Sequence, residues 1–274
     1  MKRKAWVIVA LLALCASLAG ALAGYFLLNR QTEPPVAEEF IPPPRAEPAP
    51  VPPPAPAEPA IAHPLAEMPA QTPLPDLEHS DAIIGKALRA VLGKNWKDLL
   101  LPDALIRNIV ATVDALPRQY LPARVVPIRR VAGGFITEGQ GDDLSIGASN
   151  RQRYSATIRL VEAVDSARLV AVYREFYPLF QRAYVELGYP KAYFNDRLIE
   201  AIDDLLAAPA PGEPIRLVQP KILYHYADEQ LEALSAGQKI MVRMGSENAA
   251  RLKGKLRDLR QNLAQNPAGS TSRP

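Results

Sequence analysis

The prolines of this chain are concentrated in one stretch, and that concentration decides which part of it can fold. Sixteen of the 28 prolines in the 274 residues lie between Pro34 and Pro75. Proline fixes φ and has no N–H to donate, so this stretch favours extended polyproline II over helix or central strand. We predict a proline-rich disordered linker over residues 29–76, which at about 3.1 Å per residue would span on the order of 140 Å. A plain spacer is the main interpretation, and a docking site for a proline-recognising groove is the alternative.

The residues before the linker have the pattern of a membrane anchor. Three basic residues form a stub within residues 1–4, and the uncharged, largely apolar run 5–28 follows. As a helix this run would rise about 36 Å, enough to cross a hydrocarbon core of about 30 Å. We predict a transmembrane anchor over residues 5–28 with its amino terminus in the cytoplasm, because the flanking basic residues lie mostly at its start. The small residues of Ala21-Leu22-Ala23 leave a cleaved secretory signal as the alternative.

A stripe of small residues runs along the predicted anchor. Ala16, Gly20 and Gly24 are spaced by four residues and would share one helix face. Small side chains on a membrane helix let two backbones approach closely. Homodimerisation through this transmembrane packing face is one hypothesis, and a helix without a specific partner is the simpler one.

The net charge of +3 describes no single part of the molecule. Residues 1–30 carry +4, residues 31–79 carry −7 and residues 80–274 carry +6. The part beyond the linker is therefore basic, and its length suffices for one sizeable core. The single cysteine, Cys15, lies in the predicted anchor, so this part cannot form an internal disulfide. We predict one domain over residues 77–265, followed by a disordered tail over residues 266–274.

Apolar periodicity predicts that this domain is mainly α, with a small β-hairpin or extended part. Pro178 predicts a kink or break in the helix that contains it, and Asn195 is expected to cap the next helix. A short hairpin is expected within residues 118–150, and extended pieces at 215–218 and 222–226. The expected helices cover about 81–92, 102–116, 151–163, 165–187, 195–207, 228–244 and 246–265.

The chain lacks the usual catalytic and cofactor motifs. It contains no HExxH, GxSxG, P-loop or GxGxxG sequence, and His225 lies in a strand-like run. We predict no metal site and no cofactor. Acidic residues are the strongest catalytic candidates, because Asp196 and Glu200 share one helix face and Glu186 precedes them. Paired carboxylates could cleave an envelope glycan, whereas a solvated helix face explains the same pattern without chemistry.

The last predicted helix is rich in basic residues. It carries Arg251, Lys253, Lys255 and Arg257. Such charges are common on a solvated helix, and the sharper hypothesis is an anionic partner, either a protein or an envelope polymer. Nucleic acid is not expected as a partner, because the predicted topology places this helix outside the membrane.

Several short motifs together carry a resemblance to a known family. The motifs are Leu77 to Asp81, Ile106-Arg107, Thr112 to Pro117, Asn150 to Tyr154, Tyr177 to Gln181, Ala183 to Pro190, Tyr193 to Leu198, Ile202-Asp203, Gly237 to Lys239 and Arg243 to Gly245. On these motifs the chain, over about residues 77–262, resembles the uncharacterised bacterial family known as domain of unknown function 3014. The resemblance implies a membrane anchor, a proline-rich stretch and this domain, and it brings no activity or site residues. Asp204 stands where a histidine is expected in relatives, which weakens a catalytic role at that position.

These observations predict a single-pass inner-membrane protein whose periplasmic domain acts as an interaction or scaffold module of the cell envelope. The double membrane is implied by the family resemblance. The alternative is an envelope enzyme, a glycan-acting hydrolase or lyase that uses carboxylates of the Glu186, Asp196 and Glu200 region. The candidate interaction surface consists of Glu186, Tyr189, Tyr193, Asn195, Asp196, Arg197, Glu200, Arg251, Lys253, Lys255 and Arg257.

Overall fold

A computed structural model describes residues 60–65, 73–93 and 99–264. The predicted anchor with Ala16, Gly20 and Gly24 lies outside the described residues, as do most of the predicted linker and the tail at 266–274. In the part that is described, no helix is both long and apolar enough to cross a membrane. The chain divides into two units, Met1–Pro54 and Ala55–Pro274, and every described residue belongs to the second.

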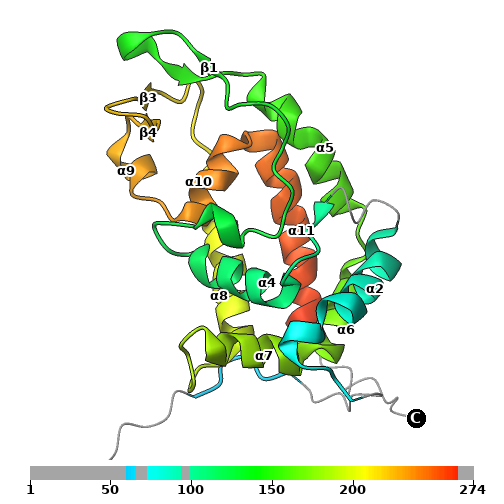
Figure 1. Cartoon of the computed structure of the whole chain (residues 1–274). Helices are drawn as coiled ribbons and strands as arrows, with labels where there is room; N and C mark the ends of the chain where they lie inside the picture. The colour runs from blue at the N-terminus through cyan, green and yellow to red at the C-terminus, as the bar shows by residue number, and fades with distance from the viewer. Residues whose placement is uncertain (1–59, 66–72, 94–98, 265–274) are drawn as a thin grey trace, which may run out of the picture. The chain divides into compact units, whose positions relative to one another are not determined.

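This second unit is mainly helical, as the periodicity predicts, and its few strands are short (Figure 1). The first predicted helix is confirmed, and it ends at Gly93, whose φ of 63° suits glycine. The helices are α2 (Asp81–Leu92), α4 (Leu105–Ala115), α5 (Asn150–Glu162), α6 (Ser166–Glu175), α7 (Tyr177–Glu186), α8 (Phe194–Ala207), α9 (Glu229–Glu232), α10 (Ala236–Arg243) and α11 (Ser246–Ala264).

The chain between residues 165 and 187 forms two helices, α6 and α7, that meet at Phe176. Phe176 has φ −97° and ψ 8°, which ends α6, and its side chain is buried. Pro178 lies in the first turn of α7, where its missing N–H removes no intrahelical hydrogen bond. The break predicted from Pro178 is therefore confirmed, and it lies two residues before the proline.

Two helix starts differ from the prediction because side chains cap them. Ser235 Oγ accepts the N–H of Gln238 at 3.0 Å and so begins α10, where the sequence pattern had continued a single helix over 228–244. At the start of α4, the Asp81 carboxylate accepts the N–H groups of Ala104 at 2.7 Å and Leu105 at 2.8 Å. The carboxylate of α2 thus caps α4, which moves its start from the predicted residue 102 to 105.

Two short antiparallel hairpins lie where the sequence predicts extended chain. The turn of the first requires Gly139, which has φ 78° and where an added Cβ would lie 2.3 Å from the Asp143 carbonyl oxygen. The hairpins are joined, because the Ile146 N–H donates to the Ile215 carbonyl at 3.0 Å. The pairs are β1 (Thr137–Glu138) with β2 (Ser145–Ile146), and β3 (Leu217–Val218) with β4 (His225–Tyr226).

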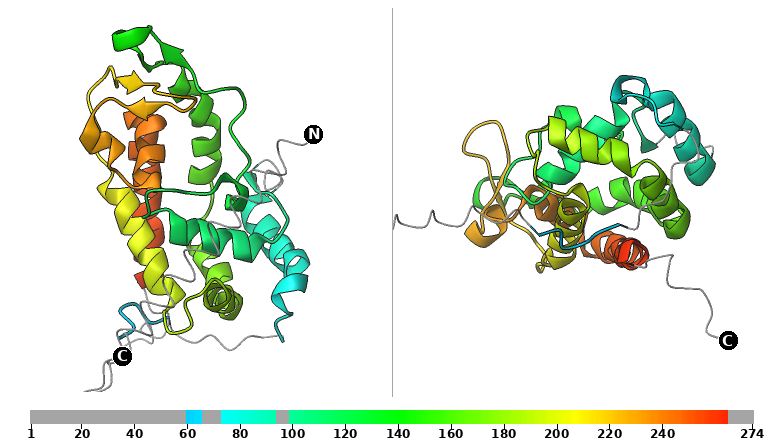
Figure 2. Two further views of the ribbon diagram at one scale, coloured as in Figure 1. Left: turned by 60° about the vertical axis from the view of Figure 1, so that its left-hand side comes forward. Right: turned by 90° about the horizontal axis from the view of Figure 1, so that it is seen from below.

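Helix α11 is the longest helix described and contacts α5, α6, α8 and α10 (Figures 1 and 2). Helix α4 packs across α7 and α8, and its residues Leu105, Ile106 and Val110 are almost fully buried. Phe194 at the start of α8 joins the same core. This packing brings the end of α4, the loop after α7 and the start of α8 to one place.

Candidate functional site

The start of α8 carries most of the predicted acidic and aromatic site residues. The helix begins at Phe194, so Asn195 lies inside it and does not cap it, contrary to the prediction. Gln181 of α7 holds this start instead: its Oε1 accepts the Phe194 N–H at 2.8 Å, and its Nε2 donates to the Ala192 carbonyl at 2.8 Å. Because donors at a helix start have no partner within the helix, a side chain from α7 can replace a local cap. The Asn195 amide is thereby left for another contact.

Residues 60–65, within the range predicted as linker, lie against this helix start. We name the three side chains that hold them, Tyr193, Asn195 and Asp196, the peptide clamp. The hydrogen bonds of the clamp use main-chain atoms of the segment, so they do not depend on the identity of its side chains. Four hydrogen bonds form: Ala62 N–H to Asp196 Oδ2 at 3.0 Å, His63 N–H to Asp196 Oδ1 at 2.7 Å, Leu65 N–H to the Tyr193 hydroxyl at 3.0 Å, and Asn195 Nδ2 to the His63 carbonyl at 2.8 Å.

The position of proline in the held segment matches the clamp. The N–H groups of Ala62, His63 and Leu65 all find acceptors. Pro64, between them, has no N–H and needs none. The clamp therefore fits a pattern of two donors, a proline and a third donor, which we name the donor pattern.

Tyr173 of α6 fixes the orientation of the clamp. Its hydroxyl donates to Asn195 Oδ1 at 3.1 Å, which leaves the Asn195 Nδ2 directed at the held segment. Burial raises the pKa of Tyr173 well above its ordinary value, so the hydroxyl stays protonated as a donor. The rings of Tyr177 and Tyr193 pack with their centroids 5.3 Å apart, which supports the second member of the clamp.

A polar group beside the clamp ties α4 to α8. Asp114, at the end of α4, is largely buried and pairs with Arg197 at 3.1 Å and with Arg118 at 2.9 Å. Arg118 also donates to the Tyr189 hydroxyl at 2.5 Å, and Arg197 pairs with Glu200 at 2.7 Å. The hydrogen bond to Asp114 raises the pKa of Arg118 above its ordinary value. We name these five residues the acid–arginine cluster.

A pocket of 280 Å³ lies between the clamp and the cluster. It brings together Tyr189, Tyr193, Asp196, Arg197 and Glu200 of the predicted surface, while Asn195 is buried at the clamp. Its three acidic and three basic side chains balance in charge, so the pocket suits a polar, weakly charged peptide better than a strongly charged polymer. The lining residues are Ala60, Asp114, Arg118, Tyr184, Tyr189, Lys191, Ala192, Tyr193, Asp196, Arg197 and Glu200.

Glu186 does not join the other predicted carboxylates. It pairs with Arg107 at 3.1 Å and with Arg182 at 3.5 Å, and it does not line the pocket. Glu200 pairs with Arg197, and Asp196 holds the segment 60–65. Glu186 therefore lies apart, whereas Asp196 and Glu200 line one pocket, each engaged with a different partner.

Among residues 60–65, 73–93 and 99–264, no group of three or more His, Cys, Asp or Glu side chains is placed to hold a metal ion. His225 of β4 has its Nδ1 3.2 Å from Glu232 Oε1, and this carboxylate also pairs with Lys239 at 2.9 Å. His225 thus has a structural partner in the hairpin region.

The basic residues of α11 are mostly engaged within the domain. Lys255 is buried, and Arg257 is exposed. Carbonyl groups at the end of a helix lack partners within the helix. Lys253 and Lys255 donate hydrogen bonds to carbonyl groups just beyond the ends of α8 and α5. Because three of the four residues have partners inside the domain, they do not form one open basic surface. The partners of Arg251, Lys253 and Lys255 are, in order, the Glu162 carboxylate, the Ala208 carbonyl at 2.5 Å and the Val164 carbonyl.

The site also contains residues that are not among those predicted, and Asp114, Arg118 and Tyr173 matter most among them. Asp114 lies four residues after the buried Val110, on the apolar stripe of α4. A carboxylate on an apolar face needs a buried partner, so this position is a signal in the sequence itself. Tyr173 lies in an aromatic stripe that predicts core packing, and periodicity carries no information about the partner of its hydroxyl.

In comparisons with known proteins, a family model described as "Protein of unknown function (DUF3014)" matches residues 105–260, more than half of the chain. The resemblance inferred from the motifs is thereby confirmed. No curated protein and no solved structure matches. The matched range contains the clamp and the acid–arginine cluster.

Proposed function

We propose that this chain, which belongs to the DUF3014 family of proteins of unknown function, is a peptide-binding interaction module of the bacterial envelope. In this proposal residues 5–28 anchor the protein in the inner membrane, residues 29–76 tether it, and the domain lies in the periplasm. The location is supported by the apolar run that follows a basic stub. The peptide role is supported by the clamp.

The observation that carries the peptide role is the set of four hydrogen bonds between the clamp and the main chain of residues 62–65. An extended segment exposes its backbone donors and acceptors, and main-chain hydrogen bonds give affinity without a strict sequence requirement. Asp196 supplies a charged acceptor for two of these donors. In this arrangement the chain's own linker occupies the site.

The held segment is expected to exchange with other peptides. Hydrogen bonds to a charged group contribute about 1.5–3 kcal/mol and neutral ones about 0.5–1.5 kcal/mol, so the four together contribute roughly 4–9 kcal/mol. Ordering four residues costs roughly 4–8 kcal/mol of conformational entropy. The two contributions nearly cancel, so the linker can be displaced by a partner that is better ordered before binding.

The partner that best fits the site is an extended, proline-containing segment of another envelope protein. Its donors would follow the donor pattern, and the balanced charge of the pocket suits a segment of low net charge. The linker itself repeats the donor pattern and can compete with such a partner at several registers. The repeats are Ala46-Glu47-Pro48-Ala49, Ala57-Glu58-Pro59-Ala60, Glu67-Met68-Pro69-Ala70 and Gln71-Thr72-Pro73-Leu74.

The experiment that tests this function compares Asp196→Ala with Asp203→Ala in the full-length protein. Asp203 is on the same helix and pairs with Arg260; it is close enough to His63 for an electrostatic interaction, but the hydrogen bonds to the N–H groups of Ala62 and His63 come from Asp196. Hydrogen exchange at Ala62 and His63 should rise in Asp196→Ala to the rate of an unbound segment, because each lost bond to the carboxylate contributes about 1.5–3 kcal/mol and the net free energy of holding the segment is small. Exchange there should not change in Asp203→Ala.

Crosslinking in cells then tests the partner. Neighbours recovered with the unmodified chain should be lost with Asp196→Ala and retained with Asp203→Ala. A partner captured equally by both variants would contradict the clamp as the contact. Unchanged exchange at residues 62 and 63 in Asp196→Ala would contradict the peptide role itself.

A further inference from the structure

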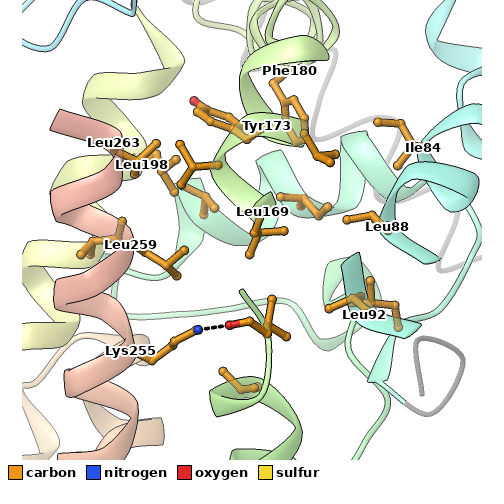
Figure 3. A pocket seen from close by; sticks show the side chains of 18 of the residues that line it. Ile84, Leu88, Leu92, Leu169, Tyr173, Phe180, Leu198, Lys255, Leu259 and Leu263 are labelled. Carbon is orange, nitrogen blue, oxygen red and sulfur yellow. Dashed lines mark hydrogen bonds between the residues drawn. The ribbon is translucent and has the colours of Figure 1, made fainter. Parts of the chain in front are cut away.

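The helices of this domain line a large, partly open apolar cavity, separate from the polar pocket at the clamp. Its volume is 320 Å³, and α2, α4, α6, α8 and α11 all contribute to its wall. Figure 3 shows Leu88 and Leu92 of α2 facing Leu198 of α8 and Leu259 of α11 across this space. All the residues that line it are buried or half-buried.

The two polar side chains in the wall turn their polar atoms away from the cavity. Lys255 Nζ donates to the Val164 carbonyl, as the dashed line in Figure 3 marks, and its methylene groups line the wall. The Tyr173 hydroxyl donates to Asn195, and its ring lines the wall. The surface offered to an occupant is therefore hydrocarbon.

A cavity of this kind is expected to hold an apolar molecule. Apolar cavities stay dry, and one of about 150 Å³ lined by leucine, isoleucine and phenylalanine binds benzene. The present cavity is about twice that size and falls within the range of ligand pockets, which is about 300–1,000 Å³. Left empty, it would deprive the side chains of its wall of packing contacts.

We propose that this cavity is a binding site for one saturated hydrocarbon chain, such as the acyl chain of a lipid or of a free fatty acid. The wall recognises the chain alone, because its lining atoms are almost entirely apolar. The site is distinct from the peptide clamp and does not depend on the function proposed for it.

A second, smaller cavity marks the route by which the chain enters. It has a volume of 40 Å³ and shares Leu92, Leu99 and Val164 with the large one. Its lining includes Ala163, which is exposed at the end of α5. The head group of a bound amphiphile would stay at this end, beside the end of α5.

Photolabelling of the full-length protein in lipid nanodiscs tests the proposal. One arm uses a phospholipid with a diazirine in its acyl chain, and the other uses a free fatty acid with the same group. Labelling of α6 and α11 peptides in either arm supports the site, and the arm that labels identifies the source of the chain. Absence of labelling in both arms would overturn the proposal.

A matched pair of variants places the site within the domain. Leu259→Trp fills the cavity, whereas Leu252→Trp makes the same change on α11 at a half-buried residue that does not line the cavity, although it packs in the same cluster as Leu259. We expect Leu259→Trp to reduce labelling at least tenfold and to raise the Tm, because it fills empty volume. Leu252→Trp should retain labelling and lower the Tm, because it overfills packed volume.

A smaller substitution tests the same site in case Leu259→Trp does not fold. Leu198→Phe enlarges a side chain of α8 that lines the same cavity. It should reduce labelling in the same direction and to a lesser degree. Full labelling of folded Leu198→Phe and Leu259→Trp proteins would show that the chain binds elsewhere and would overturn the proposal.

Discussion

Replacing Asp114 by asparagine should destabilise the domain far more than an equivalent change on its surface. The side chain of Asp114 is 11% exposed and that of its partner Arg197 is 14% exposed, so this ion pair is largely buried. Asparagine keeps the size of the side chain and removes its charge. The Arg197 guanidinium then retains Glu200, whose side chain is 60% exposed, and the Asp114 carbonyl. The change thus removes the buried half of its charge pairing.

The expected loss in the free energy of unfolding is about 3 kcal/mol. Removing one partner of a buried pair costs about 3–5 kcal/mol, and the contacts that Arg197 keeps place this case at the lower end. The pair with Arg118 adds little, because that side chain is 49% exposed and surface pairs contribute about 0–1 kcal/mol. A loss of about 3 kcal/mol corresponds to a fall in Tm of about 6–12 °C for a domain of this size.

Urea unfolding followed by circular dichroism measures this loss, with Asp203→Asn as the control. Asp203 pairs with Arg260, and these side chains are 46% and 41% exposed, so its loss should stay below about 1 kcal/mol. The hydrogen bond from Arg260 lowers the pKa of Asp203 in the folded state. Asp203 therefore contributes to stability above its pKa in the unfolded state, and this contribution is lost as the pH falls through its pKa in the folded state. The control and the parent protein should therefore converge in acid. If Asp114→Asn costs no more than Asp203→Asn, the reasoning about the buried pair is refuted.

Three further predictions follow from glycine packing, tyrosine ionisation and the orientation of Asn195. Gly237→Ala should lower the free energy of unfolding by about 1 kcal/mol, because the new Cβ would lie 2.8 Å from Leu205 Cδ2. Gly254→Ala has free space around the new Cβ and should raise the free energy of unfolding by about 0.5–1 kcal/mol. Thermal unfolding of the two variants measures both changes. Burial raises the pKa of Tyr226 to about 12, so its contribution to stability is full below pH ~10 and lost as the pH rises through the folded pKa; an alkaline titration of tyrosinate absorbance and circular dichroism should show this loss, absent in Tyr226→Phe. Tyr173→Phe should speed hydrogen exchange at residues 62 and 63, because Asn195 loses its orienting donor; unchanged exchange would exclude that orienting role.

Local signals in the sequence predict most of the helices. Apolar spacing places α2, α5 and α8 within one or two residues, and Pro178 predicts the break between α6 and α7. The failures occur where a distant residue replaces a local signal. Asp81 caps α4 and Gln181 holds the start of α8, and neither can be inferred without knowing which helices are neighbours.

The candidate site divides along the same line. Tyr193, Asp196 and Glu200 are spaced by three and four residues along α8, so helical periodicity alone places them on one face. Helical periodicity does not predict the partners of Lys253 and Lys255. These partners are carbonyl groups just beyond α8 and α5, and only the packing of α11 brings them close to the two lysines. A basic stripe in a sequence therefore shows charge, and it does not show whether that charge faces solvent or another helix.

The empty volume beside α8 is the feature least accessible to sequence reasoning. Apolar residues at helical spacing look the same whether they fill a core or line a cavity. A hydrocarbon chain in this space of 320 Å³ would supply its wall with packing contacts that the empty cavity lacks. The domain should therefore be more stable with the chain bound than without it.

The cavity and the clamp share one helix and one side chain. Phe194 and Leu198 of α8 line the cavity, while Asn195 and Asp196, between them, hold the linker segment. Tyr173 has its ring in the cavity wall and its hydroxyl on Asn195. A chain in the cavity that presses on this ring therefore also acts on the amide that holds His63. If it changes the affinity of the clamp for its segment, the segment must change the affinity of the cavity by the same factor, because the binding free energies of two sites are coupled reciprocally.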